Sequence, residues 1–595
     1  MRTLIDIISE ELKQAFTACG YAEKYGQAAV SNRPDLCQYQ CNGAMAAAKE
    51  YKKAPIMIAQ EVVAALDKKK FSEVTAIAPG FINIKVCPYY LTLYLEDMAK
   101  AEKYGYEEQG RGEKIIVDYG GPNVAKPLHI GHLRSAVIGE SIKRICRFAG
   151  NEVIGDVHLG DWGLQMGLII EELKERKPEL CYFNESFTGE YPAEAPFTIS
   201  ELEEIYPCAS GKSKVDEEFK ERAHTATAKL QEGYAPYIAL WKHILRVSVE
   251  DLKRNYENLD VSFDLWLGES DAQPYIPAMI DDMVEKGYAR ESMGALVVDI
   301  AEETDTKELP PCIVRKSDGA ALYETTDLAT IIQREKDYGP DRYIYVVDKR
   351  QELHFVQVFR AAKKCGLVSA DKELTFLGFG TVNGKDGKPF KTRDGGVMRL
   401  ENLISGVNEE VFNKVMSGRE MPEDEARAIA KTVGLAALKY ADLSNQIAKD
   451  YIFDIDRFTS FEGNTGPYIL YTMVRIKSIL TKYAEMAGAA DGVIAHPYSG
   501  ESETREYGAA ETDLMLTAAK FNDVVAKTYE EMAPHKLCQY IYEMANAFNS
   551  FYHNNKIMGE EDRKKQSEWI ALITLVLKLL ETCIDLLGFE APERM

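Results

Sequence analysis

Closely spaced cysteine pairs are missing from this sequence of 595 residues. Its 11 cysteines occur singly, no Cys-x-x-Cys is present, and the closest pair is Cys37 and Cys41. Zinc sites and disulfide frameworks need cysteines at characteristic spacings, so we expect neither zinc nor disulfide bonds. Because unpaired thiols suit a reducing compartment, we expect a cytoplasmic protein.

A long hydrophobic run without charges is also absent. The most apolar segment, residues 569–589, contains Lys578, Glu581 and Asp585, and three charges inside one span argue against a membrane helix. The N-terminus lacks the features of a signal peptide. It predicts instead an amphipathic helix, because apolar residues recur there at helical spacing: Leu4, Ile5, Ile8, Leu12 and Phe16. We therefore expect no membrane partner.

The sequence has fewer positively charged than negatively charged residues. Lysine and arginine number 71 against 94 aspartates and glutamates, which gives a formal net charge of −23. Since phosphate contacts need lysine and arginine, the overall charge taken alone argues against nucleic-acid binding, although it does not exclude a local basic stripe. The sequence has no internal repeat and no low-complexity linker, and its length suggests three or four domains of roughly 150 residues.

Three regions differ in pattern. Residues 1–110 mix helices with a half-buried strand at 81–86 and end in a polar linker with several glycines. Residues 111–454 alternate strands and helices, with a mostly helical, acidic insertion at about 170–290. From residue 455 to 595 the pattern is helical.

The middle region predicts the fold class. Its strands are expected at 114–119, from 152 onward, and at 295–300, 342–347 and 374–382. Strands that alternate with helices favour a parallel, Rossmann-type sheet. The predicted class is therefore α/β, with an N-terminal α+β domain and an all-helical C-terminal domain.

The stretch Asp118–Arg134 carries the clearest chemical signal. It lies where the first strand of the sheet leads into a helix, and open parallel sheets bind ligands at this edge. A helix N-terminus offers free N–H groups to an anion. His129 and His132 share one face of that helix, with Gly131 between them leaving room for a flat base. Two imidazoles at a helix N-terminus can stabilise charge on a transferring α-phosphoryl group.

Chance could produce the same tetrapeptide. With nine histidines and 42 glycines, a His-x-Gly-His arises by chance in roughly one such chain in a hundred. Its position at a strand–loop–helix junction, after two prolines and Asn123, favours a functional role.

His129–His132 resembles the signature of class I aminoacyl-tRNA synthetases, and the longer stretch Pro122–Ser135 resembles the arginyl enzymes in particular. Further segments agree along the whole chain: Tyr39–Met45, Leu159–Gln165, Asp348–His354, Phe461–Tyr468 and Ala591–Met595. The resemblance implies that ATP and L-arginine form arginyl-adenylate, which then esterifies the 3′-terminal adenosine of the arginine tRNA. It also implies a monomer and activation that depends on bound tRNA, and phosphoryl-transfer chemistry leads us to expect Mg²⁺ with ATP.

The resemblance assigns roles to individual residues. The ATP contacts are His129, Gly131, His132 and His354, with Lys126 neutralising phosphates. The arginine contacts are Asp118, Asn123, His129, Tyr323, Asp327 and Gln351. A bidentate carboxylate suits a guanidinium, and by resemblance Tyr323 and Asp327 supply that site. Read without the resemblance, these two residues would be a solvated face of a helix.

The second class I signature, Lys-Met-Ser-Lys-Ser, is degenerate here. We align Lys388–Thr392 with it, so that Lys388 and Lys391 join Lys126 as candidate catalytic lysines. Read alone, the same segment could be an ordinary glycine-rich hairpin.

Contacts with tRNA are expected at both ends of the chain. The N-terminal domain resembles the part of the family that touches the tRNA elbow, with candidates Gln40, Asn42, Phe81 and Asn83. The C-terminal helices resemble an anticodon-binding domain, with candidates Tyr468, Arg475, Lys477 and residues 549–552. Aromatic residues at helical spacing are more often part of a core.

Three other functions are compatible with parts of this pattern. A synthetase for another amino acid, such as cysteine or glutamate, would not need the carboxylate of Asp327. A small-molecule nucleotidylyltransferase shares the His-x-Gly-His chemistry but leaves the C-terminal region unexplained. A catalytically inactive tRNA-binding relative would fail to bind ATP.

Overall fold

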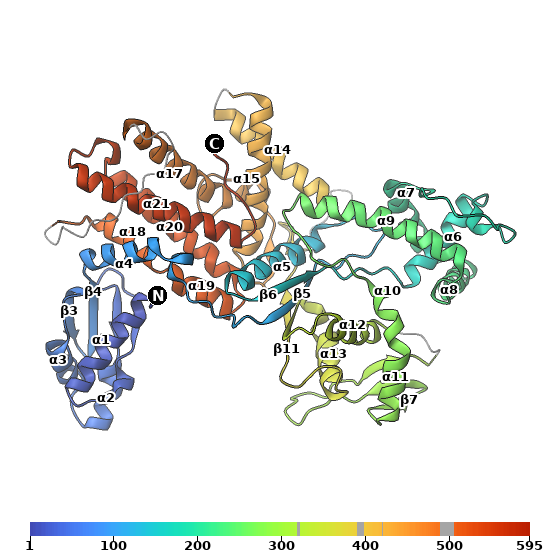
Figure 1. Ribbon diagram of the computed structural model, residues 1–595, viewed down its shortest axis with the longest axis horizontal. Helices are drawn as coiled ribbons and strands as arrows, with labels where there is room; N and C mark the ends of the chain where they lie inside the picture. The colour runs from blue at the N-terminus through green and yellow to red at the C-terminus, as the bar shows by residue number, and fades with distance from the viewer. Residues whose placement is uncertain (318–321, 389–397, 419–420, 488–504) are drawn as a thin grey trace.

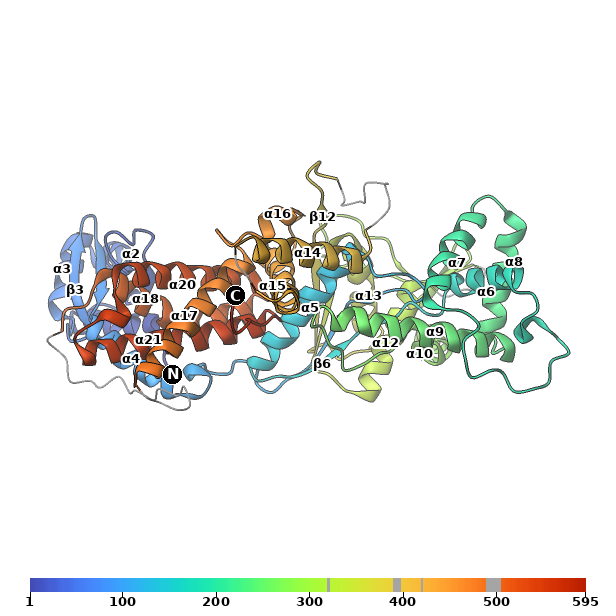
Figure 2. The same cartoon turned by 90° about the horizontal axis from the view of Figure 1, so that it is seen from above.

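The structure is a computed structural model that describes residues 1–317, 322–388, 398–418, 421–487 and 505–595. The chain forms an elongated molecule, with the N-terminal module at one end and a helical insertion at the other (Figures 1 and 2). The central parallel sheet and the C-terminal helices lie between these ends.

The N-terminal module is an antiparallel sheet with helices packed on it. Its strands are in the order β1 (Ala28–Val30), β2 (Tyr39–Cys41), β4 (Phe81–Val86) and β3 (Phe71–Ile77). The helices are α1 (Leu4–Ala18), α2 (Gly43–Tyr51), α3 (Pro55–Ala65) and the connecting α4 (Pro88–Lys100). The expected amphipathic helix at the N-terminus is α1, which buries Leu4, Ile8, Leu12 and Phe16.

The central sheet is parallel throughout, as the alternation of strands and helices predicted. Its strands are in the order β11 (Glu373–Phe379), β10 (Arg342–Asp348), β5 (Lys114–Tyr119) and β6 (Glu152–Asp156). Ile115, Ile116 and Val117 of β5 are completely buried, as expected for a strand covered on both faces. The main covering helices are α5 (Ile130–Phe148), α12 (Tyr323–Asp337) and α13 (Glu352–Lys364).

The prediction for one strand of this sheet was wrong. Residues 295–300 were expected to continue the parallel alternation, but β8 (Ala295–Val298) lies in a separate antiparallel sheet between β7 (Ala289–Ser292) and β9 (Cys312–Arg315). Met293 and Gly294 both have positive φ, 51° and 81°, which is the geometry of a tight two-residue hairpin. A hairpin returns the chain beside β7 and so excludes a parallel crossover.

Helices make up both the insertion and the C-terminal region. The insertion contains α6 (Leu164–Arg176), α7 (Ile199–Lys212), α8 (Glu217–Gln231), α9 (Ala235–Glu257), α10 (Glu269–Ala272) and α11 (Ile276–Glu285). The C-terminal helices are α14 (Leu400–Gly418), α15 (Glu423–Leu443), α16 (Ile455–Phe458), α17 (Gly466–Ala487), α18 (Ala509–Ala519), α19 (Phe521–Glu530), α20 (Pro534–Asn554) and α21 (Arg563–Leu586). Two short strands pair in parallel with each other: β12 (Val382–Asn383), which precedes α14, and β13 (Tyr451–Ile452), which follows α15. No helix in the described ranges is long and apolar enough to cross a membrane.

Candidate functional site

The two histidines of the central motif form one unit at the start of α5. His129 is the N-cap residue, and its Nδ1 accepts a hydrogen bond from the N–H of Gly131 at 3.0 Å. The Nδ1 of His132 accepts from the N–H of His129 at 3.2 Å. The centres of the two rings are 4.0 Å apart. Both rings are therefore fixed against the free N–H groups of the helix end.

These bonds determine where each ring carries its proton. A neutral imidazole that accepts at Nδ1 must hold its hydrogen on Nε2. Burial, together with Lys126, lowers the pKa of His129, and burial with the charge of His129 lowers the pKa of His132 to about 3. At neutral pH the helix end therefore presents two neutral Nε2–H donors.

Gly131 makes room for the His129 ring. A Cβ at this position would lie 2.7 Å from Cε1 and 2.9 Å from Nδ1 of His129. The space that we assigned to a flat base is thus next to a histidine ring in this structure. Lys126, which precedes the motif, places its Nζ 4.5 Å from the centre of the Tyr206 ring on α7.

Only the first residue of the segment that resembles the second signature, Lys388, is described, and it is exposed. Lys391 lies outside the described residues. The description resumes at Met398, whose carbonyl accepts from the N–H of Ile130 at 3.2 Å, and the N–H of Leu400 donates to the carbonyl of Leu128 at 2.9 Å. Residues 398–400 therefore lie directly beside the histidine motif.

A buried arginine lies at the edge of the sheet. Arg334 of α12 donates to Asp118 at 2.5 Å and to Asp156 at 2.6 Å, and its side chain is completely buried. Burial opposes ionisation of Asp156, but Arg334 and His158 outweigh it and lower its pKa. Asp118, one of the predicted arginine contacts, is therefore already paired with a cation and is 14% exposed.

Tyr323 and Asp327 lie on the first turns of α12, as their spacing suggested, and Asp327 contacts His354 of α13. The Nε2 of His354 is 2.5 Å from a carboxylate oxygen of Asp327, and its Nδ1 is 3.5 Å from Glu324. Burial opposes protonation of His354, but these two carboxylates raise its pKa to about 9. Tyr323 is 74% exposed. Gln351, also exposed, lies on the single 3₁₀ turn Lys349–Gln351 between β10 and α13.

A second carboxylate, Glu269, whose charge interacts with that of Asp327, was missed in the sequence. It begins α10, and its N–H donates to the carbonyl of Leu159 at 3.0 Å. Burial, and then the charge of Asp161, raise its pKa to about 7, with Asp327 contributing; Glu269 also interacts with Tyr323. A single glutamate in an acidic insertion gives no signal in the sequence. Only the pairing of distant segments brings Glu269 to the carboxyl ends of the strands of the central sheet.

Asn123 is fixed by a loop that the sequence had marked. Residues around it pair with Gly160: the N–H of Val124 donates to the Gly160 carbonyl at 3.0 Å, and the N–H of Gly160 donates to Pro122 at 3.1 Å. A Cβ at Gly160 would lie 2.1 Å from Oδ1 of Asn123. Glycine is thus required for Asn123 to stay where it is.

The predicted tRNA contacts at the N-terminus lie on adjacent strands. Gln40 and Asn83 are opposite each other on β2 and β4, and Nε2 of Gln40 donates to Oδ1 of Asn83 at 2.9 Å. Asn83 is buried, whereas Phe81 is half-buried and Asn42 is exposed at the start of α2.

The C-terminal candidates meet between α17 and α20. The hydroxyl of Tyr468 accepts from Asn549 at 2.9 Å, and Arg475 donates to Asn549 at 2.5 Å. The guanidinium of Arg475 also lies 5.5 Å from the centre of the Tyr552 ring. Lys477 is not part of this cluster, since it pairs with Glu593 at 2.7 Å.

Within the described parts of the chain, no group of three or more His, Cys, Asp or Glu side chains is arranged to hold a metal ion. Each of the 11 cysteines, all in described residues, is a free thiol.

Comparison with known families places these features in context. The family described as tRNA synthetases class I (R), catalytic domain, matches residues 96–455. An arginine–tRNA ligase of Agathobacter rectalis is 60% identical, with both chains covered completely. The chain belongs to the arginyl-tRNA synthetase family. Two further family models match its ends: the arginyl tRNA synthetase N terminal domain at residues 2–86 and the DALR anticodon binding domain at residues 469–595.

Other relatives of the family agree. An arginine–tRNA ligase of Alkaliphilus oremlandii is 57% identical over the whole of both chains. The crystal structure of arginyl-tRNA synthetase from Plasmodium falciparum has the same fold, with a TM-score of 0.80 at 24% identity, and covers all of both chains. The Thermus thermophilus arginyl-tRNA synthetase gives a TM-score of 0.74 at 23% identity, again over both complete chains.

Proposed function

We propose that this chain, an arginine–tRNA ligase, carries out its reaction where β5 leads into α5. ATP and L-arginine give arginyl-adenylate and pyrophosphate, and the arginyl group then moves to the 3′-terminal adenosine of the arginine tRNA. The observation that carries the assignment of the site is the pair of neutral Nε2–H donors of His129 and His132 at a helix N-terminus. Such preorganised donors stabilise charge that develops on a transferring phosphoryl group.

The phosphates of ATP bind at this helix end. His129 and His132 donate to oxygens of the α-phosphoryl group, and Lys126, Lys388 and Lys391 neutralise the pyrophosphate that leaves. ATP enters as its Mg²⁺ complex, whose metal is held mainly by phosphate oxygens. In support, Lys126 lies close enough to lower the pKa of both histidines, and the carbonyl of Met398 accepts a hydrogen bond from the N–H of Ile130 at the start of α5.

The amino acid binds beside the phosphates, at the edge of the sheet. Asp327 and Glu269 accept the guanidinium, Tyr323 packs over it, and Asp118 and Asn123 receive the α-ammonium group. Gln351 and His354 lie at the far side, where His354 also contacts ATP. The charges at this site support the arrangement: two carboxylates, Glu324 and Asp327, flank the protonated imidazole of His354, and Glu269 lies close enough to Asp327 for their negative charges to interact. A cationic side chain balances this excess, whereas the side chains of cysteine and glutamate do not.

The remaining parts of the chain bind tRNA. We assign residues 1–110 to the tRNA elbow, 111–454 to catalysis and 455–595 to the anticodon. The C-terminal cluster of Tyr468, Arg475 and Tyr552 combines aromatic faces with a guanidinium, which suits unstacked bases. The protein acts as a monomer in the cytoplasm, where its 11 free thiols stay reduced.

A nucleotidylyltransferase would share only the histidine motif. It has no use for the C-terminal helices, which match an anticodon-binding family over residues 469–595. An inactive tRNA-binding relative would not need to preserve the tautomer-fixing bonds of His129 and His132.

The test is aminoacylation of total tRNA by the purified protein, with each radiolabelled amino acid offered separately with ATP and Mg²⁺. We expect charging with arginine alone. Charging with another amino acid would overturn the pocket at Asp327 and Glu269. No charging by the folded protein, together with tight binding of arginine tRNA, would indicate the inactive relative. A His132→Ala protein that still binds arginine but aminoacylates tRNA slowly would assign His132 to the phosphate site and not to the arginine pocket.

A further inference from the structure

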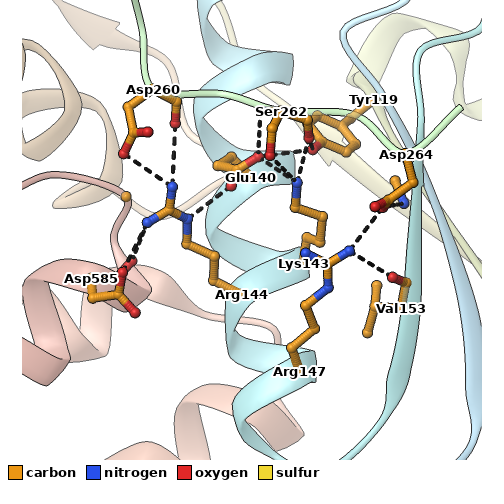
Figure 3. Close-up of polar contacts among 12 residues, drawn as sticks. Tyr119, Glu140, Lys143, Arg144, Arg147, Val153, Asp260, Ser262, Asp264 and Asp585 are labelled. Carbon is orange, nitrogen blue, oxygen red and sulfur yellow. Dashed lines mark hydrogen bonds and ion pairs between the residues drawn. The ribbon is translucent and has the colours of Figure 1, made fainter. Parts of the chain in front are cut away.

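Polar side chains on α5 hold the loop that follows α9 (Figure 3). Glu140 and Lys143 are almost completely buried, with 2% and 1% of their side chains exposed. An oxygen of Glu140 accepts from the N–H of Ser262 at 3.1 Å, and the Nζ of Lys143 donates to the carbonyl of Ser262. The hydroxyl of Tyr119 donates to the same carbonyl at 2.7 Å. Both backbone groups of Ser262 are therefore bound by buried side chains.

Arg144 holds the same loop and connects it to the C-terminal helices (Figure 3). Its Nε lies 2.8 Å from Glu140, one terminal nitrogen lies 3.0 Å from the carboxylate of Asp260, and the other lies 3.0 Å from Asp585 at the end of α21. The Nζ of Lys439 on α15 donates to the carbonyl of Asp260 at 2.9 Å. Asp260 is thus fixed from α5 and from α15, and Arg144 joins it to α21.

From this anchor the chain runs beside β6 to Glu269. Backbone hydrogen bonds tie it to residues 155–159: Asp264 N–H and Leu265 N–H to the Gly155 carbonyl at 2.8 and 3.0 Å, Val157 N–H to Leu265 at 3.2 Å, Leu159 N–H to Leu267 at 2.8 Å, and Glu269 N–H to Leu159 at 3.0 Å. We call residues 260–269 the ladder segment. Because a paired, extended segment keeps a fixed register, its anchored beginning sets the position of Glu269 at its end.

We propose that Arg144 is a positioning residue for arginine recognition, which sets the place of Glu269 through the ladder segment. This rests on the proposed role of Glu269 in binding the guanidinium. Arg144 binds neither the histidine motif nor Asp327, so its loss should weaken the binding of arginine and leave that of ATP unchanged. A carboxylate displaced by a fraction of an ångström loses much of a charged hydrogen bond, because such bonds depend steeply on geometry.

The experiment compares the KM values for arginine and ATP in aminoacylation. Arg144→Ala should raise the KM for arginine roughly tenfold and change that for ATP by less than about twofold. Arg176→Ala is the matched control: Arg176 also pairs at i,i+4 with a glutamate that is 2% exposed, Glu172, but its ion pair lies within α6, away from the ladder segment. Asp260→Asn, at a side chain that is 47% exposed, provides a second variant that preserves the fold if Arg144→Ala does not.

A double-mutant cycle separates positioning from general damage. If Arg144 acts through Glu269, Arg144→Ala (or Asp260→Asn) should add little to the KM for arginine in a Glu269→Gln background. If the two substitutions multiply in their effects on the KM for arginine, or if the KM for ATP rises equally, Arg144 has only a structural role and the proposal is refuted. A Glu269→Gln enzyme with the wild-type KM for arginine would refute the proposed pocket itself, and with it the route through Glu269.

Discussion

The Nε2 of His354 lies 2.5 Å from a carboxylate oxygen of Asp327. The residue proposed to receive the substrate guanidinium therefore already has a cation against it, because the pKa of His354 is raised to about 9. A carboxylate has two oxygens and several lone pairs, so Asp327 can keep the imidazolium on one side and accept the guanidinium on the other. His354 then orients Asp327, and its positive charge offsets part of the repulsion that Asp327 feels from the carboxylates of Glu324 and Glu269.

His354 should make the stability of the protein depend on pH. Its pKa is raised from an ordinary 6.5 to about 9 in the folded state, so its contribution is fully present below pH 6.5 and is lost as the pH rises through 9. We expect the free energy of unfolding of the wild type to exceed that of His354→Gln most at pH 6, and the difference to fall by on the order of 3 kcal/mol by pH 10. Urea denaturation across this range measures it, and a difference that does not change with pH would contradict the ion pair.

Arginine binding should weaken in acid because of Glu269. The pKa of this carboxyl is about 7, and only its ionised form attracts a guanidinium. Below pH 7 the KM for arginine should rise by up to about tenfold per pH unit, while the KM for ATP stays level. Glu269→Gln should have a high KM for arginine and lack this rise between pH 7 and 6. A variant that retains the acid-side rise would assign it to another group.

His132→Ala should slow adenylate formation about 100-fold or more without unfolding the protein, because a preorganised donor to the phosphoryl group is lost. Rapid-quench measurement of single-turnover adenylate formation is the appropriate assay. His535→Ala is the control, since His535 also has a lowered pKa but lies on α20. Near-normal turnover by His132→Ala would remove this residue from the mechanism. With a pKa of about 3, His132 should cause no loss of rate between pH 8 and pH 6.

Gly160→Ala tests the place of Asn123. A Cβ there would lie 2.1 Å from Oδ1 of Asn123, so Asn123 must move, and we expect the KM for arginine to rise roughly tenfold. Gly163→Ala is a control on the same loop, because a Cβ at Gly163 has no atom within 4 Å. Equal kinetics for the two variants would show that Asn123 does not contact the amino acid.

The dependence of activation on tRNA is a further expectation carried from the family. Exchange of pyrophosphate into ATP should need both arginine and arginine tRNA. Arginine-dependent exchange without tRNA would refute it for this chain.

The elements with local signals were predictable. The apolar run of β5, the glycine and proline loop after it and the histidines at the start of α5 depend on neighbouring residues, and all three lie where the sequence indicated. The strand at 295–300 looked the same as a parallel strand, because its pairing is decided by the turn at Met293 and Gly294 rather than by its own residues.

Other parts of the site depend on distant pairings that have no local trace. Glu269 reaches the pocket because residues 265–268 pair with 156–159, more than 100 residues earlier in the chain. Lys391 lies outside the described residues, so its role stays a prediction. Arg334 was not singled out in the sequence, because only the tertiary structure buries it between Asp118 and Asp156.

That buried arginine gives the protein an internal copy of its substrate's functional group. Arg334 bridges Asp118 and Asp156 and is itself completely buried between them. A free amino acid cannot enter this position while Arg334 fills it. The proposed substrate site is thereby confined to the carboxylates outside it, Asp327 and Glu269.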